Sequence, residues 1–444
     1  MTPRSTLPLV HIETFGCQMN ESDSQLVRTI LKQEGFVFTE ERDYADVVLV
    51  NTCAIRENAF NKIYAHLGAL KAIKRTRPLV VGVLGCMAQN LKSQLAEREP
   101  MVDVLAGPDS YRQLPALLSS ALEAQEQGFL QKGFALDLSE YETYEGILPD
   151  RDDGVNAWIT IMRGCDNFCS FCVVPYTRGR ERSRASEDIL REARDAADRG
   201  FSQITLLGQN VNSYRAGTGD FARLIYAVAD TPGIKRVRFT SPHPKDFPPA
   251  LIDAIATHPN ICKHIHLPMQ AGSDRILDLM GRSYTQAEFL ALVDRIRAII
   301  PDIVLTTDII CGFCSETERD FEDTYGMVEQ IRFDSAYVFK YSERKNTIAA
   351  RRYPDDIPDQ VKGRRVSTLV ERQRAIALDR NRRYIGRDVA ILVEGDATKS
   401  VLQGMGKTDG NLTVVWDKGN NRVEPGTLIT KHIVDASAAT LYGR

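Results

Sequence analysis

The sequence predicts a three-part α/β chain: a parallel-sheet α/β domain at residues 8–127, a partial or closed parallel βα-barrel at residues 155–383 and a small β-barrel at residues 384–444. Two separate series of short apolar runs alternate with stretches of helical periodicity, which indicates two units built from strands and helices in turn. From about Tyr384 the helical pattern stops and glycine-punctuated β-like runs follow, as in a small β-barrel. Residues 137–154 are acidic with little helical periodicity, and we expect a linker over residues 128–154.

Composition limits the class of protein. The chain has 444 residues, 43% of them hydrophobic, and a net charge of −3. That charge neither indicates nor excludes a nucleic-acid partner, because phosphate binding needs only a local basic surface. No run of about 18 apolar residues occurs, and residues 1–8 lack the apolar core of a secretion signal. We therefore expect a cytoplasmic protein with no membrane partner.

The N-terminal part reads as strands separated by helices. Ser24–Glu34 is predicted to be a helix, because its apolar residues fall on one face and Gly35 ends the pattern. Strands separated by helices imply a parallel sheet. The predicted strands are Leu9–Phe15, Asp46–Val50, Leu79–Leu84 and Val102–Ala106.

The central part repeats the strand and helix alternation six times, which predicts the βα-barrel. Ser186–Arg199 is a typical helix of this part: Ser186 is its N-cap, acidic residues fill the first turn and Gly200 ends it. The predicted strands are Ala157–Met162, Gln203–Leu207, Arg236–Thr240, His264–Leu267, Ile303–Ile309 and Ala336–Tyr341.

The C-terminal part has three β-like runs, Arg387–Val393, Leu412–Trp416 and Thr427–Val434. A basic helical stretch at 362–387 precedes and overlaps them. It is either a phosphate-contacting surface or a helix packed on the barrel, and the sequence favours the first only slightly. Its cations are Lys362, Arg364, Arg365, Arg372, Arg374, Arg380, Arg382, Arg383 and Arg387.

Three of the nine cysteines, Cys165, Cys169 and Cys172, have C-x3-C-x2-C spacing in a loop after a predicted strand. Such compact spacing lets three thiolates converge on one iron–sulfur cluster. No fourth cysteine follows, so one iron would be open to a substrate or cofactor. The alternative is a zinc site, which usually needs four ligands, and no fourth Cys or His lies nearby in the sequence.

Cys17, Cys53 and Cys86 are far apart in the sequence, yet each follows a predicted strand. Residues just past the carboxyl ends of parallel strands line one crevice, so these thiols would converge without a local spacing motif. The arrangement predicts a second three-cysteine cluster. The alternative is three buried structural cysteines.

The C-x3-C-x2-C triad with Phe171 before its last cysteine resembles the signature of radical S-adenosylmethionine (SAM) enzymes. The resemblance implies that the triad holds a [4Fe–4S] cluster whose fourth iron site binds the amino and carboxylate groups of SAM. Reductive cleavage of SAM then supplies a 5′-deoxyadenosyl radical, so the cofactor carries the chemistry.

Further segments resemble the methylthiotransferase family, and together they cover nearly the whole chain. Gly16–Asn20 is similar to the members that modify N6-isopentenyladenosine in tRNA. The resemblance implies an N-terminal methylthiotransferase domain, a central partial (β/α)6 radical SAM barrel and a C-terminal TRAM domain, an OB-like RNA-binding module. The segments are Phe15–Asn20, Asn51–Ala59, Leu84–Met87, Cys169–Gly179, Leu206–Asn212, Thr240–Pro244 and His266–Asp274.

The implied reaction is methylthiolation of carbon 2 of N6-isopentenyladenosine at tRNA position 37. It would use two SAM molecules and two [4Fe–4S] clusters, with the auxiliary cluster at Cys17, Cys53 and Cys86. We expect the tRNA anticodon stem-loop as substrate, a reductant such as flavodoxin or ferredoxin, and a monomeric enzyme.

Polar residues after the barrel strands are the candidates for holding SAM, because βα-barrels gather their sites at that rim. They are Gln209, Asn210, Ser241 and Gln270, with Phe171 beside the cluster and Arg282 as a charged fork for the SAM carboxylate. The candidates for RNA contact are Arg380, Arg382, Arg383 and Lys407. Two segments depart from the usual family form, Cys314-Ser315 and Ser283, and we expect Cys311 and Cys314 to be structural thiols.

Alternative functions remain open at this point. The same chemistry could act on another tRNA adenosine or on a ribosomal protein. A non-catalytic iron–sulfur regulator would bind RNA without cleaving SAM. A zinc-stabilised RNA-binding module would contain zinc and no iron.

Overall fold

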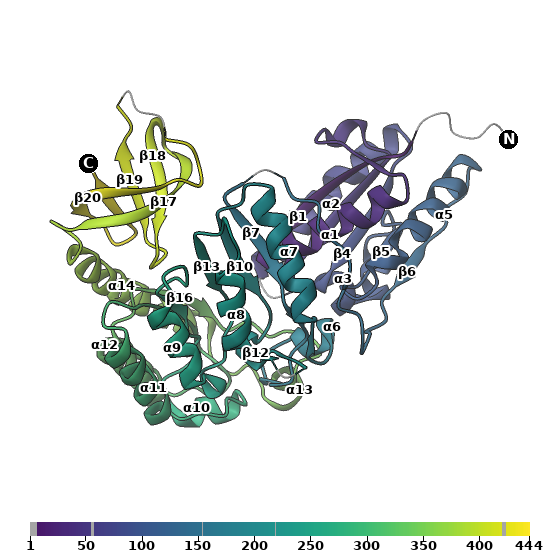
Figure 1. Cartoon of the computed structure of the whole chain (residues 1–444). Helices are drawn as coiled ribbons and strands as arrows, with labels where there is room; N and C mark the ends of the chain where they lie inside the picture. Colours follow the sequence, from purple (N-terminus) through teal and green to yellow (C-terminus); the bar gives the residue numbers. More distant parts are fainter. Residues whose placement is uncertain (1–6, 55–56, 153, 218, 420–422) are drawn as a thin grey trace.

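The computed structural model describes residues 7–54, 57–152, 154–217, 219–419 and 423–444, with the side chains of 57–61 left out. Three bodies follow one another in chain order, with the central barrel between the N-terminal sheet and the C-terminal β-barrel (Figure 1). This arrangement confirms the predicted fold class. None of the helices in these ranges is long and apolar enough to cross a membrane.

The N-terminal domain is a six-stranded, all-parallel sheet in the order β2-β1-β3-β4-β5-β6. Every residue of β3 is buried, with Val47 and Leu49 against one helical layer and Val48 and Val50 against the other. A strand covered on both faces needs apolar residues on both, which is why β3 reads as a continuous apolar run. The strands are β1 Leu9–Phe15, β2 Val37–Phe38, β3 Val47–Thr52, β4 Val80–Gly85, β5 Val104–Ala106 and β6 Gly133–Ala135. The helices are α1 Gln18–Gln33, α2 Glu57–Thr76, α3 Cys86–Leu91, α4 Ser93–Arg98 and α5 Leu114–Glu126.

Two boundaries differ from the sequence-based expectation. Strand β6 lies inside the stretch 128–154 that we expected to be a linker, and it pairs with β5 as the sixth strand of the sheet. Helix α1 begins at Gln18 rather than at Ser24, because Cys17 acts as its N-cap and the Asn20 side chain accepts a hydrogen bond from the Cys17 backbone N–H.

The central domain is a partial barrel of six parallel strands. Two three-stranded sheets, β13-β10-β7 and β14-β15-β16, are joined by one parallel bridge between Val237 and Ile261. The largest apolar core fills the space between these strands and the outer helices. The strands are β7 Asn156–Thr160, β10 Gln203–Leu207, β13 Arg236–Phe239, β14 His264–His266, β15 Val304–Cys311 and β16 Ser335–Lys340, with short pairs β8 Met162–Arg163 and β9 Arg182–Ser183, and β11 Arg215–Ala216 and β12 Gly219–Asp220. The helices are α6 Val174–Arg178, α7 Ser186–Asp198, α8 Phe221–Ala229, α9 Pro249–Thr257, α10 Asp274–Leu279, α11 Gln286–Ile299, α12 Glu318–Ile331 and α13 Ile348–Arg352.

Helix α14, Asp359–Arg382, leads into a closed five-stranded barrel in the order β17-β18-β19-β21-β20. Arginines of β13 hold this barrel against the central domain through its backbone. Arg238 donates to the carbonyls of Thr408 at 2.6 Å and Asp409 at 2.7 Å, and Arg236 donates to that of Ala390 at 3.0 Å. The strands are β17 Asp388–Ala397, β18 Ser400–Thr408, β19 Thr413–Asp417, β20 Leu428–Ala436 and β21 Thr440–Gly443.

Candidate active site

The structure brings Cys17, Cys53 and Cys86 to one edge of the N-terminal sheet. Each follows one of three neighbouring parallel strands, β1, β3 and β4, whose carboxyl ends share that edge. A hydrogen bond with Cys53 lowers the pKa of the Cys17 thiol to about 6 against the effect of burial. Burial raises the pKa of Cys86. The three thiols therefore lie close enough to influence one another, as ligands of one group must.

An amide network locks the strand ends that carry these cysteines. Asn20 Nδ2 donates to Asn51 Oδ1 at 3.0 Å and to the Thr52 carbonyl at 3.2 Å, while Asn51 Nδ2 donates to the Asn20 carbonyl at 2.9 Å. Gly85 has φ +87°, and a Cβ there would lie 2.5 Å from Asn51 Oδ1. The asparagines and the glycine next to these cysteines thus have a physical role, because they fix the loops. Arg56, which is part of the resembling segment Asn51–Ala59, lies outside the described residues.

The second triad lies in a loop whose first residue must be a glycine. Gly164 has φ +80°, and a Cβ would lie 1.9 Å from the Arg180 carbonyl oxygen. Ser170 anchors the middle of the loop, because its N–H donates to the Met280 carbonyl and its hydroxyl to the Leu279 carbonyl, both at 2.7 Å. Burial raises the pKa of Cys165 to about 11 and that of Cys172 to about 12, so burial by itself favours the neutral thiols.

Arg282, the predicted fork for the SAM carboxylate, lies against this triad. Its Nη1 donates to Cys169 Sγ at 3.3 Å, its Nε to the Tyr284 hydroxyl at 3.1 Å and its Nη2 to the Pro268 carbonyl at 3.3 Å. All three nitrogens are engaged within the protein. Arg282 is therefore placed to orient the Cys169 thiol, with one further N–H on each of Nη1 and Nη2, and Ser283 beside it is exposed.

The other predicted SAM residues lie at the carboxyl ends of the barrel strands. Gln209 Oε1 and Asn210 Oδ1 are buried acceptors without a hydrogen-bond partner. Ser241 and Gln270 have φ +58° and +67°, a left-handed backbone that is costly for residues other than glycine and gathers at functional sites. Unmet acceptors at the rim fit the ammonium and hydroxyl groups of SAM. Phe171 packs partly buried against the barrel core.

The two cysteine triads lie against one another across the domain boundary. Val173, which follows Cys172, forms one buried cluster with Cys86 and with Ala54, which follows Cys53. Arg178, at the end of the same segment, donates from Nε to Cys86 Sγ at 3.2 Å. The two triads are therefore parts of a single site.

A buried ion cluster fastens this junction. The Asp23 carboxylate, fully buried in α1, accepts from Arg163 at 2.7 Å and from Arg178 at 2.8 Å. Burial alone would raise the pKa of Asp23, but the two guanidinium groups hold it below its ordinary value. Sequence reasoning missed all three residues. The available signal was the density of arginines from Arg178 to Arg184, most of which are buried.

Among the residues that the structure describes, no three Cys, His, Asp or Glu side chains converge tightly enough to hold a single metal ion. A [4Fe–4S] cluster does not need such a point, because each thiolate binds a different iron atom.

The predicted RNA contacts separate into two groups. Arg380 is 11% exposed and grips Asp334 with Nε and Nη2, so it is a packing residue and not a free cation. Arg382 is exposed, Arg383 is exposed and also contacts Asp334 at 3.4 Å, and half-buried Lys407 donates to Thr413 Oγ1 at 2.7 Å.

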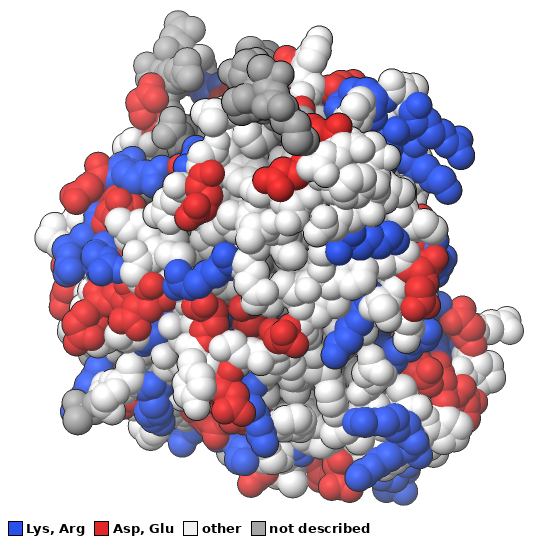
Figure 2. Space-filling model, turned by 90° about the vertical axis from the view of Figure 1, so that its right-hand side faces the viewer, with Lys and Arg blue, Asp and Glu red and all other residues white. Residues whose placement is uncertain are grey.

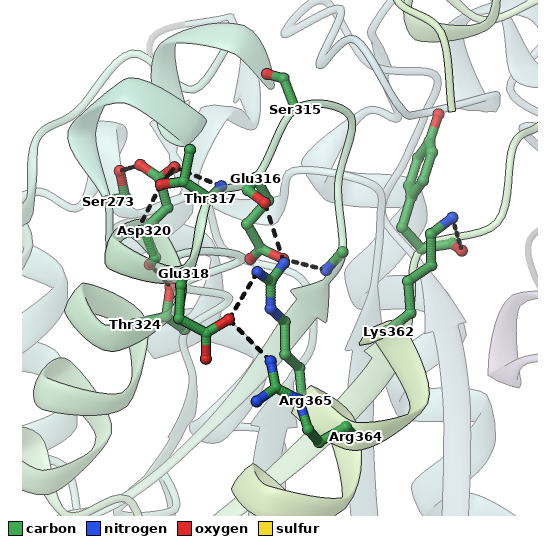
Figure 3. A network of polar contacts seen from close by, with 12 residues as sticks. Ser273, Ser315, Glu316, Thr317, Glu318, Asp320, Thr324, Lys362, Arg364 and Arg365 are labelled. Atoms are coloured by element: carbon green, nitrogen blue, oxygen red, sulfur yellow. Dashed lines mark hydrogen bonds and ion pairs between the residues drawn. The ribbon is translucent and has the colours of Figure 1, made fainter. Parts of the chain in front are cut away.

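Other cations of α14 also face the barrel. Figure 3 shows Arg365 donating to Glu316 at 2.9 Å and to Glu318 at 3.1 Å, with Arg364 on Glu318 at 2.9 Å. These pairs hold the loop after β15, which contains the buried thiol Cys314 and follows the buried thiol Cys311 at the strand end. Much of the basic stretch is therefore a packed helix. On the face seen in Figure 2, positive and negative side chains are interleaved, with no continuous basic surface.

Comparison with known proteins agrees with this geometry. Residues 9–107 match the family described as uncharacterized protein family UPF0004, and residues 159–328 match the radical SAM superfamily. The chain is 47% identical to the tRNA-2-methylthio-N(6)-dimethylallyladenosine synthase of Porphyromonas gingivalis, over 98% of this chain and 94% of that one. It is 46% identical to the synthase of the same name from Phocaeicola vulgatus, over 97% and 94%.

The chain belongs to the tRNA-2-methylthio-N(6)-dimethylallyladenosine synthase family.

This methylthiotransferase also resembles a solved structure of lower identity in its fold. The radical SAM methyltransferase TsrM from Kitasatospora setae superposes with a TM-score of 0.60 at 15% identity, covering 78% of this chain and 77% of that one. The likeness confirms the fold of the radical SAM core.

Proposed function

We propose that this methylthiotransferase attaches a methylthio group to carbon 2 of N6-isopentenyladenosine at position 37 of tRNA. The observation that carries the proposal is the contact between the two cysteine triads through Val173, Cys86 and Arg178. Sulfur insertion needs a sulfur donor beside a radical source, and two triads in one site provide for both. Family membership supplies the substrate class.

The thiol sets fit two [4Fe–4S] clusters by the chemistry of their donors, since each offers three sulfurs and no fourth protein ligand in its loop. When bound, the clusters and SAM supply the radical and the methylthio group. We assign Cys165, Cys169 and Cys172 to the SAM-binding cluster and Cys17, Cys53 and Cys86 to the auxiliary one.

The chain's own residues position and enclose these groups. Gln209 and Asn210 offer buried acceptors to SAM, and Arg282 orients the thiol of Cys169. Four of the six cysteines are buried and Cys17 and Cys172 are partly buried, which limits access of water and so protects a radical from side reactions. The target base must leave its stack to reach them, as an unpaired anticodon-loop base can.

For RNA contact we propose Arg382, Arg383 and Lys407, together with the C-terminal β-barrel as a TRAM module. We propose a cytoplasmic location, since a tRNA-modifying enzyme must meet its tRNA there. A flavodoxin or ferredoxin would supply the electron, and one chain holds both triads, so we propose that the monomer is active.

The first test is iron and acid-labile sulfide in anaerobically reconstituted protein. We expect about eight irons in the parent and about four in the Cys17→Ala/Cys53→Ala/Cys86→Ala variant. Cys311→Ala/Cys314→Ala is the matched control, because it removes buried thiols outside the site, and it should keep about eight. About four irons in parent and triple variant alike would refute the auxiliary cluster.

The second test is turnover. Isopentenylated tRNA incubated with SAM and dithionite should yield 2-methylthio-N6-isopentenyladenosine on nucleoside mass spectrometry, together with 5′-deoxyadenosine. Unmodified tRNA and threonylcarbamoylated tRNA are the comparison substrates. Product from either of these alone would move the function to another adenosine, and RNA binding without 5′-deoxyadenosine would identify a regulator.

A further inference from the structure

Arg178 has an unusual set of partners for a buried arginine. It is 3% exposed, its Nε donates to Cys86 Sγ at 3.2 Å and its Nη2 donates to Asp23 Oδ2 at 2.8 Å. Its Nη1 is buried with no hydrogen-bond partner. An unpaired buried N–H costs free energy, so the fold retains a donor that an acceptor absent from the polypeptide would satisfy.

The charges around Arg178 also indicate that its partner outside the polypeptide is negatively charged. Asp23 is shared by two guanidinium groups, those of Arg163 and Arg178, and the exposed fractions of the three side chains are 0%, 3% and 4%. The two guanidinium groups share this one carboxylate, so Asp23 alone does not balance their charge. A buried charge needs a counterion to be tolerated. A [4Fe–4S] cluster on three thiolates supplies one, because the three thiolates outweigh the dipositive core by one negative charge.

We propose that Arg178 is the positioning counterion of the auxiliary cluster. Its Nε donates a hydrogen bond to the sulfur of the ligand Cys86, and its Nη1 can donate to a sulfur of the cluster or to a sulfur bound at the iron that has no protein ligand. This inference rests on the proposed function, since it needs a cluster at Cys17, Cys53 and Cys86. A positive charge and hydrogen bonds next to a cluster stabilise its reduced state, so Arg178 raises the reduction potential of the auxiliary cluster. Asp23 holds the guanidinium in place and ties it to Arg163, beside Cys165.

Arg163 provides a matched control. It is equally buried and binds the same carboxylate, Asp23 Oδ1 at 2.7 Å, and its guanidinium stacks 4.6 Å from the Tyr144 ring. Its Nε and Nη1 are also buried without a hydrogen-bond partner, and among the described residues its guanidinium donates to Asp23 and to no cysteine sulfur. Arg163→Gln and Arg178→Gln therefore remove the same charge from the same ion cluster, but only the second removes a donor to Cys86.

The experiment uses the full chain with Cys165→Ala/Cys169→Ala/Cys172→Ala, anaerobically reconstituted so that the auxiliary cluster is observed alone. Redox titration followed by electron paramagnetic resonance gives its midpoint potential, and iron analysis gives its loading. We expect Arg178→Gln to shift the potential to a more negative value than Arg163→Gln does, and Arg178→Lys, which keeps the charge, to lie between parent and Arg178→Gln.

Other outcomes of this experiment also support or overturn the role of Arg178. Loss of iron in Arg178→Gln alone, with both variants unfolding at the same temperature, also supports the proposal, because the cluster then depends on its counterion. Equal potentials and equal loading in both variants would overturn it, as would parallel loss of folding in both, which makes Arg178 a structural clamp. A parent without iron would instead refute the proposed function, since that outcome does not depend on Arg178.

Discussion

Asp23→Asn is the sharpest test of how the two domains are joined. The carboxylate is 0% exposed and pairs with two arginines at 2.7 and 2.8 Å, which lie 140 and 155 positions away in the chain. An amide keeps the size but removes the charge, so two buried guanidinium groups lose their counterion. Breaking a buried ion pair in this way costs about 3–5 kcal/mol. For a domain of this size that corresponds to a fall of roughly 10 °C in the unfolding temperature.

The assay is differential scanning fluorimetry of the anaerobic apo-protein at neutral pH. Asp152→Asn is the matched control, because Asp152 pairs with Arg28 of the same helix α1 at 2.8 Å yet is 79% exposed. An exposed pair contributes at most about 1 kcal/mol, so the control should unfold within a few degrees of the parent. If Asp23→Asn and Asp152→Asn have the same unfolding temperature, the buried ion cluster does not hold the two domains together.

Three more predictions follow from single side chains. Gly164→Ala should abolish loading of the SAM-binding cluster and halve the iron content, because its Cβ would lie 1.9 Å from the Arg180 carbonyl oxygen, while the auxiliary cluster stays. Burial, with Arg282 nearby, lowers the pKa of His243 from 6.5 to about 3, so the fold disfavours its protonation. The stability that neutral His243 contributes is complete above pH 6.5 and is lost as the pH falls toward 3, and His243→Gln should flatten the fall in unfolding temperature between pH 6.5 and 5. Arg380→Ala should lower the unfolding temperature and leave tRNA affinity unchanged, whereas exposed Arg382→Ala should weaken tRNA binding and reduce its salt dependence by about one charge, with no effect on stability. The reverse pattern for the two arginines would show that α14 presents its other face to RNA.

The convergence of the auxiliary cysteines could be predicted because the ends of strands can be recognised in a sequence. Each auxiliary cysteine follows an apolar run, and in a parallel sheet that fact alone brings Cys17, Cys53 and Cys86 to one edge. The same local signals misplaced the start of α1. Asp23 and Ser24 resemble residues before a helix, but they lie within it, and Ser24 bonds Thr14 Oγ1 at 2.7 Å across the domain core.

Partners distant in sequence account for most of the remaining differences. Arg380 and Arg365 read as surface cations because nothing nearby in the sequence opposes them, yet Asp334 and Glu316, more than 40 positions earlier, neutralise them in the fold. The role of Arg178 was equally hidden, because its partners are a carboxylate and a thiol of the other domain. Periodicity shows which side of a helix is buried, but not which charges will meet there.

The docking of the C-terminal barrel has a consequence for how recognition can diverge. Arg236 and Arg238 hold backbone carbonyls, and Lys235 likewise donates to the Gly426 carbonyl at 2.7 Å. Carbonyl groups are the same whatever residue carries them, so side chains on these loops can be exchanged while the barrel keeps its distance and angle to the catalytic domain. The distance between the C-terminal barrel and the catalytic domain is thereby independent of the side chains on the barrel surface, and either can change without altering the other.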